Sequence, residues 1–321
     1  MKPRGLLARA ALVVACAAAC QPSPVAQRGR GASPAATGGA RAASPATAAL
    51  LARLESREVT ESSGIVASRR NPGLFWTHND SGDGPFVYAF DRAGRARGVW
   101  RVEGAGAEDW EDIACGPGPE RGRPYLYAGD IGDNSARRAQ IVVYRFPEPA
   151  VADSDAATTR ATARATERAE AVRLKYPDGP HDAEALLVHP VNGDIYVVTK
   201  SVGGAGVYRL SAAEATAGVN TLTLVATLRG PDFFGTSVTG GDISPDGRRV
   251  ALCDYAQGYE LRLPDSARDF DEVWRQTPTV VRLGARRQGE AVCYSLDGAA
   301  LLATSEGAHP PLYEVTPAGA R

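Results

Sequence analysis

Five copies of one plan, built from short apolar runs and tight turns, predict an all-β fold: a β-propeller of five four-stranded blades. Each copy has a small or acidic lead-in, an apolar strand, a turn and a second strand that ends in a polar group. The first strands begin at Ser62, Glu111, Glu184, Gly241 and Glu290. The turns after them carry Pro-Gly, Asn-Gly or Asp-Gly, which accept the positive φ of tight hairpins. Repetition of one supersecondary unit is typical of propellers.

The other strands of each copy fit further apolar runs. Second strands are predicted at 74–77, 125–128, 195–198, 250–253 and 301–304. Third strands are predicted at 86–90, 141–144, 207–210, 259–262 and 312–315. Fourth strands are predicted at 98–102, 171–176, 222–228 and 279–283.

The fifth copy runs out after its third strand, while an unpaired strand at 50–55 precedes the first copy. A propeller closes its ring to avoid exposed strand edges. We therefore expect the N-terminal strand to complete the last blade.

Two alternatives to this architecture are open. The stretch 147–170 gives a sixth blade if it hides extra strands. We interpret 153–170, which is rich in Ala, Thr and Arg, as an excursion between two strands of blade 2, or as a short helix. A β-sandwich is the other fold to consider, but it explains neither the five-fold plan nor the closure.

The N-terminus has the pattern of an export signal rather than of a folded domain. Basic residues up to Arg9 precede an apolar run at 10–19, and Ala17-Ala18-Ala19-Cys20 resembles a lipoprotein processing site. Cys16 is the alternative acceptor, and a simple secretory signal is the other alternative. We predict a signal peptide at 1–20, a disordered tether at 21–47 and a single propeller domain at 48–321. The protein is then a cell-envelope lipoprotein (periplasmic, outer-membrane or cell-surface) or a secreted protein, and it touches the membrane only through its anchor.

The charge balance argues against a nucleic-acid-binding protein, and the few cysteines argue against a disulfide-rich fold. The 321 residues carry 36 basic and 37 acidic side chains, a net charge of -1, so no basic nucleic-acid footprint is present. Beyond the signal, Cys115, Cys253 and Cys293 lie in apolar runs, which predicts buried free thiols, with a Cys253–Cys293 bridge as the alternative. We expect a monomer.

Two sets of polar residues should meet at one end of the central channel, because first strands start there and second strands end there. The first set is Glu61, Glu111, Glu184, Asp242 and Glu290. The second set is Asp80, Asp130, Lys200, Asp254 and Glu306. Nine acids and one lysine call for a compensating cation, and Ca²⁺, which prefers carboxylate and carbonyl oxygens, is the predicted cofactor. Capping of loops by individual acids is the alternative reading.

Several motifs give the chain a resemblance to a known group. They are Glu61-Ser-Ser-Gly-Ile, His78-Asn-Asp-Ser-Gly, Asp109-Trp-Glu-Asp-Ile-Ala, Gly129-Asp-Ile-Gly-Asp-Asn, Asp182-Ala-Glu-Ala-Leu and Gln288-Gly-Glu-Ala-Val. From Leu50 to Thr316 the sequence resembles bacterial secreted propellers of the esterase-like phytase group, and more distantly the regucalcin/gluconolactonase propellers. The resemblance implies a central divalent cation held by channel-lining residues, with an acid as base. By that analogy the metal ligands are Glu111, Glu184 and Glu290, followed by Asp242 and Asp130.

Two functions fit these observations. The first is a metal-dependent hydrolase of a phosphoester, ester or lactone, with Asp130 or His181 as proton acceptor. Its small anionic or ester substrate would meet Lys200, His78 and Asp80, although Lys200 equally fits a salt bridge within the ring. The second is a non-catalytic envelope-binding or scaffold propeller with a structural cation. No Gly-x-Ser-x-Gly, His-Glu-x-x-His or P-loop motif occurs.

Overall fold

The computed structural model describes residues 47–201, 203–229 and 237–316. The chain divides into two units, Met1–Ala42 and Ala43–Arg321, and the described residues belong to the second. The predicted signal peptide, Cys16, Cys20 and almost all of the predicted tether lie outside the described residues. Among the described residues, no helix has the length and apolar character needed to span a membrane.

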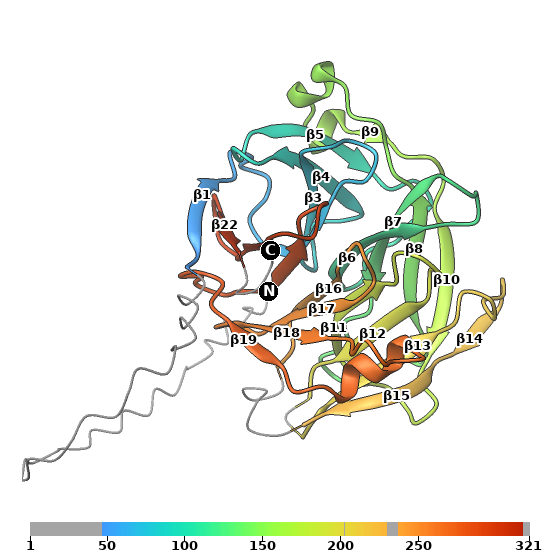
Figure 1. Ribbon diagram of the computed structural model, residues 1–321. Coiled ribbons are helices and arrows are strands. Elements are labelled where there is room, and N and C mark those ends of the chain that lie inside the picture. Colours follow the sequence, from blue (N-terminus) through green and yellow to red (C-terminus); the bar gives the residue numbers. More distant parts are fainter. Residues whose placement is uncertain (1–46, 202, 230–236, 317–321) are drawn as a thin grey trace, which may run out of the picture. The chain divides into compact units, whose positions relative to one another are not determined.

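Within the described residues, twenty strands form five antiparallel four-stranded blades (Figure 1). Blade 1 contains β2 (Ser62–Ala67), β3 (Leu74–Asn79), β4 (Phe86–Asp91) and β5 (Ala96–Arg101). Blade 2 contains β6 (Trp110–Pro117), β7 (Pro124–Asp130), β8 (Ile141–Pro147) and β10 (Glu170–Lys175). Blade 3 contains β11 (Ala183–Val188), β12 (Ile195–Thr199), β13 (Ala205–Leu210) and β15 (Thr223–Leu228). Blade 4 contains β16 (Gly240–Ile243), β17 (Arg249–Cys253), β18 (Gly258–Arg262) and β19 (Thr279–Val281). Blade 5 contains β20 (Ala291–Tyr294), β21 (Leu301–Thr304), β22 (Pro311–Val315) and β1 (Ala49–Arg53).

The ring closes as the sequence predicts. β1 pairs antiparallel with β22, from Ala49 opposite Glu314 to Arg53 opposite Pro311, and the two strands lie side by side in Figure 1. The innermost strands β2, β6, β11, β16 and β20 each contact the next, and β20 contacts β2. The architecture is therefore a five-bladed β-propeller, and the prediction of strand-exchange closure is confirmed. The six-bladed alternative is wrong.

The core lies between the blades, because alternate residues of each strand face opposite neighbours. Five buried apolar clusters fill the five interfaces. Trp76, Trp100 and Trp110, for example, pack between blades 1 and 2. The three described cysteines are buried and free, as predicted, and the alternative Cys253–Cys293 bridge does not form.

The excursion from blade 2 is confirmed, and it leaves its own blade. It forms two short 3₁₀ helices, η1 (Asp153–Ala157) and η2 (Arg160–Thr162), and then β9 (Arg164–Ala165). β9 pairs in parallel with the outer strand β5 of blade 1, where Figure 1 shows it. A second short strand, β14 (Val219–Thr221), adds in parallel to β10, and a third 3₁₀ helix, η3 (Phe270–Arg275), precedes β19.

Candidate metal centre at the channel mouth

Three β-bulges shape one mouth of the channel. In blades 1, 2 and 3 the register between first and second strands shifts by one residue, which leaves Ser63, Glu111 and Glu184 as the extra residues. A bulge redirects a side chain that regular pairing would place elsewhere. Glu290 lies directly before β20, two residues after Gln288. Glu111, Glu184 and Glu290 are all buried, each with 5% of its surface exposed.

One of these carboxylates belongs to a compact group. Carboxylate oxygens of Asp80, Asp109 and Glu111 all lie within 4.8 Å of one another. Asp80 follows β3, while the other two residues lie at the start of β6. Gly132 makes room for them, because a Cβ at that position would collide with the Glu111 and Asp109 carboxylates. The mouth between blades 1 and 2 therefore brings three carboxylates together that could hold a metal ion.

Two of these acids, Glu111 and Asp109, have raised pKa values, and burial is the first cause in both. Burial, and then the charges of Glu184, Asp80, Asp109 and Asp182, raise the pKa of Glu111 to about 11. The pKa of Asp109 is raised for the same kinds of reason, burial first and Asp80 next. A divalent cation would remove the penalty of ionising such a group.

The other two first-choice ligands have their own partners. Glu184 forms an ion pair with Lys200, whose ammonium also lies 5.3 Å from the centre of the Tyr255 ring. Burial nevertheless raises the pKa of Glu184 to about 7. Glu290 accepts a 2.9 Å hydrogen bond from Gln288, and burial together with Glu306 raises its pKa to about 8. Lys200 therefore forms the predicted salt bridge within the ring, and its predicted contact with a substrate stays a prediction.

Asp130 fixes the loop that carries Asp109, one of the three clustered acids. Its carboxylate accepts the backbone N–H groups of Glu108 and Asp109, both at 3.1 Å, and pairs with Arg138 at 2.8 Å. Asn79 makes the equivalent bonds in blade 1, and Asp254 caps its own loop through 2.7 Å bonds from two backbone N–H groups. In these three blades the polar residue at this strand end is a cap.

Two further aspartates lie deeper, on the innermost strands. Asp242 accepts the N–H groups of Ile243 at 2.8 Å and Tyr294 at 2.9 Å, which ties β16 to β20. Asp112 accepts those of Leu186 at 3.0 Å and Gly241 at 3.3 Å, which ties β6 to β11 and β16. Asp242 thus joins strands and is not among the three clustered ligands.

The two predicted histidines have different surroundings. His78 is fully buried between blades 1 and 2, where its Nδ1 lies 2.8 Å from the Asn79 carbonyl and burial lowers its pKa. His181 lies at the rim, where its Nε2 is 3.0 Å from both an Asp178 oxygen and the Tyr208 hydroxyl.

Asp109 and Asp182 were not predicted as mouth residues, although a signal for them exists. Each lies two residues before a bulged glutamate, as Glu61 lies two before Ser63. The carbonyls of Glu61, Asp109 and Asp182 also accept equivalent backbone bonds from the end of the second strand. At this offset blades 1, 2 and 3 carry an acid, whereas blade 5 has Gln288.

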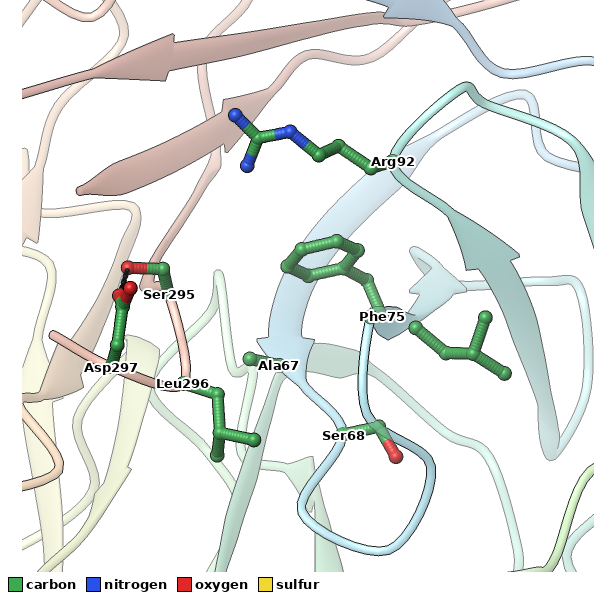
Figure 2. Close-up of a pocket in the computed structure, with 9 residues that line it drawn as sticks. Ala67, Ser68, Phe75, Arg92, Ser295, Leu296 and Asp297 are labelled. Carbon is green, nitrogen blue, oxygen red and sulfur yellow. Dashed lines mark hydrogen bonds between the residues drawn. The ribbon is translucent and has the colours of Figure 1, made fainter. Parts of the chain in front are cut away.

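Two hollows lie near the channel ends. One of about 210 Å³ opens at the acidic mouth between blades 5 and 1, beside Glu61, Arg287 and Glu306. The other, about 340 Å³, lies among turns at the opposite ends of the strands, and Figure 2 shows Phe75 and Leu296 facing it. There Arg92 pairs with Glu314, and Asp297 accepts a 2.6 Å bond from Ser295.

Comparisons with known proteins do not assign this chain to a family. No protein family model matches the sequence, and no curated protein does. Among solved structures, one described as "Structure of Dos1 propeller" is similar with a TM-score of 0.38 and 10% identity, covering 80% of this chain and 78% of that one. The predicted likeness to esterase-like phytases stays a prediction.

Proposed function

We propose that this protein binds Ca²⁺ at the acidic mouth of its channel, with Asp80, Asp109 and Glu111 as protein ligands. The observation that carries the proposal is the approach of their carboxylate oxygens to within 4.8 Å of one another. Carboxylates converge in this way when a hard cation offsets their repulsion, and Ca²⁺ takes oxygen ligands almost exclusively. The absence of histidine and cysteine from the cluster disfavours zinc and copper.

The proposal changes the ligand set inferred from the resemblance. Glu111 is retained, and Asp80 and Asp109 replace Glu184 and Glu290, which have Lys200 and Gln288 as partners. Asp130 supports the site by fixing the loop of Asp109.

Calorimetric titration with Ca²⁺ and with Mg²⁺ tests the site, together with metal analysis of the purified protein. Glu111→Gln and Asp109→Asn should each weaken Ca²⁺ binding by at least about tenfold, which is about 1.4 kcal/mol. Asp265→Asn is the charge-matched control, because that side chain is fully exposed and pairs only with Arg248 among the described residues. Absence of Ca²⁺ binding to the wild type, or equal binding to all three variants, would refute the proposal.

A second candidate function, metal-dependent hydrolysis, is favoured by the residues around His181. Its Nε2 is engaged by Asp178 and Tyr208, and its ring packs edge-on against Tyr176 at 5.0 Å. Although burial acts in the opposite direction, hydrogen bonds from His181 and Tyr208 lower the pKa of Asp178. An ionised aspartate that fixes one imidazole nitrogen leaves the other to accept a proton.

In this function, bound Ca²⁺ would polarise the scissile phosphoester, ester or lactone group. His181 would accept the proton of the attacking water, and Asp178 would orient the imidazole. The test is turnover of nitrophenyl phosphate, nitrophenyl acetate and a γ-lactone, with and without chelator, by the wild type and His181→Gln. Retained Ca²⁺ binding without turnover would favour the binding propeller instead.

We also infer export and lipid anchoring at Cys20, supported by the basic and apolar segments that precede it. Metabolic labelling with a fatty acid should mark the wild type and Cys16→Ala but not Cys20→Ala. The reverse pattern would move the anchor to Cys16, and no labelling would indicate a simple secretory signal.

A further inference from the structure

The loop that carries Asp80 is fixed at both of its ends. It joins β3 to β4 and reads Asn79-Asp80-Ser81-Gly82-Asp83-Gly84, which has some likeness to a calcium-binding loop. The second acid of this loop, Asp83, already has hydrogen-bonding partners within the protein. Asp83 accepts hydrogen bonds from Asn79 Nδ2 at 3.0 Å and from the Tyr88 hydroxyl at 2.7 Å, and only 6% of its side chain is exposed.

Asn79 fixes the other end through its amide. Its Oδ1 accepts the N–H groups of Thr60 at 2.9 Å and Glu61 at 3.0 Å. Its Nδ2 donates to the Glu58 carbonyl at 2.6 Å as well as to Asp83. Because all four of its hydrogen-bonding positions are used, Asn79 has one orientation, and Asp80 follows it directly.

The positive charge for this loop comes from another blade. Arg160 of η2, within the excursion of blade 2, forms an ion pair with the remaining oxygen of Asp83. Its backbone N–H also donates to the Glu58 carboxylate, at 3.0 and 3.1 Å. Within the described residues, Arg160 is the basic side chain that pairs with Asp83.

The excursion is itself fastened to blade 1, so Arg160 is held in place. The Thr158 hydroxyl accepts the Val99 N–H at 2.8 Å, and β9 pairs with β5. Arg97 of β5 adds an exposed ion pair with Asp153 at 2.6 Å. This last contact binds the same excursion without touching the loop.

We propose that Arg160 is a positioning residue for the cation site, acting through Asp83 and Asn79 to aim Asp80 at Asp109 and Glu111. This inference rests on the proposed Ca²⁺ function. Without Arg160, Asp83 would be a nearly buried carboxylate without a cation, and the loop would relax to expose it to water. Asp80 would then leave the cluster, and the site would keep two of its three ligands.

The direction in which Ca²⁺ affinity changes when Arg160 is removed distinguishes a positioning role from a purely electrostatic one. Removing a positive charge near a cation site strengthens cation binding if charge alone matters. Loss of positioning weakens it.

The experiment is calorimetric titration of Ca²⁺ into the wild type, Arg160→Ala, Arg160→Lys and Arg97→Ala. We expect Arg160→Ala to lower the affinity at least about tenfold. Arg160→Lys should recover part of the loss, because it retains the charge, and Arg97→Ala should bind like the wild type.

Equal or tighter binding by Arg160→Ala would overturn the inference, and so would an equal loss in Arg97→Ala. If Arg160→Ala does not fold, the comparison of Asp83→Asn with the wild type replaces it, and unchanged affinity there would also overturn the inference. Failure of the wild type to bind Ca²⁺ would instead refute the proposed function itself.

Discussion

Carboxylate side chains have three different roles at one end of this propeller. Glu111 joins a cluster of oxygens, Asp130 caps a loop and Asp242 ties two inner strands together. Their tasks follow from what their oxygens meet: other carboxylates in the first case and backbone N–H groups in the other two. Backbone N–H groups stabilise the negative charge of the carboxylate that accepts them, so a capping or strand-joining role needs no metal.

Asp242 makes stability depend on pH. Burial raises its pKa to about 7 from an ordinary value of 3.8, although bonds from Tyr294 and Ile243 oppose the shift. Because the folded-state pKa is the higher one, this residue's stabilising contribution is complete below about pH 4 and is lost as the pH rises to about 7. Asp242→Asn should therefore reduce the pH slope of unfolding by up to about 1.4 kcal/mol per pH unit. Urea unfolding without Ca²⁺ at pH 4 to 7 measures it, and an unchanged slope would contradict the assignment.

Gly132 provides a test of the cluster in which no acid is replaced. Its backbone is compatible with alanine, but an added Cβ would displace the Glu111 and Asp109 carboxylates. Gly132→Ala should weaken Ca²⁺ binding at least about tenfold, measured by the same titration. Gly218→Ala is the control, since its Cβ would meet only Thr216, at 3.7 Å. Wild-type affinity in Gly132→Ala would place the cation elsewhere.

At the scale of elements, the sequence predicts the strands better than the tasks of individual acids. Turn dipeptides and apolar runs mark each hairpin, because tight turns need particular residues and strands need apolar faces. The place of Glu111 at the acidic mouth, where it lies beside Asp80 and Asp109, also follows from the repeat. A capping acid and an acid of the cluster both occupy strand ends, however, so the sequence pattern does not distinguish Asp130 from Asp80; the loop geometry does.

The excursion shows a second limit of prediction. Its composition indicates a departure from the repeat, but no local pattern reveals that Arg160 reaches Asp83 in another blade. Contacts between an irregular segment and a neighbouring blade depend on the path of the whole segment. Periodicity describes only the regular part of the chain.

Glu148, at the start of this excursion, fastens blade 2 to the first turn of blade 1. It is fully buried and accepts hydrogen bonds from Trp76 Nε1 at 2.8 Å, the Arg70 N–H at 3.0 Å and the Ser68 hydroxyl. Glu148→Ala would leave several donors without acceptors, and each unsatisfied buried donor costs about 1–3 kcal/mol. We therefore expect the free energy of unfolding, measured in urea, to fall by at least about 3 kcal/mol. Glu167→Ala, at an exposed position, should change stability by less than about 0.5 kcal/mol. Similar losses in both variants would show that Glu148 is not a fastening residue.

At the scale of the molecule, closure was the most predictable feature, because it follows from counting strands. A ring of sheets leaves a free edge wherever a blade is incomplete, and free edges recruit other chains. β1 covers the edge of β22, and Leu54, which follows β1, is buried between blades 5 and 1. The beginning and the end of the fold therefore stabilise one blade together.

A variant that lacks residues 1–54 should lose this closure, whereas one that begins at Ala43 should keep it. The shorter variant exposes the N–H and C=O groups of β22 and the apolar surface that Leu54 covers. We expect its melting temperature to fall by roughly 2–4 °C for each kcal/mol lost, and we expect soluble oligomers in size-exclusion chromatography. A synthetic peptide of residues 47–56 should restore the melting temperature, because it supplies the missing strand. Equal stability of the two variants, without peptide, would mean that contacts between β20 and β2 close the ring on their own.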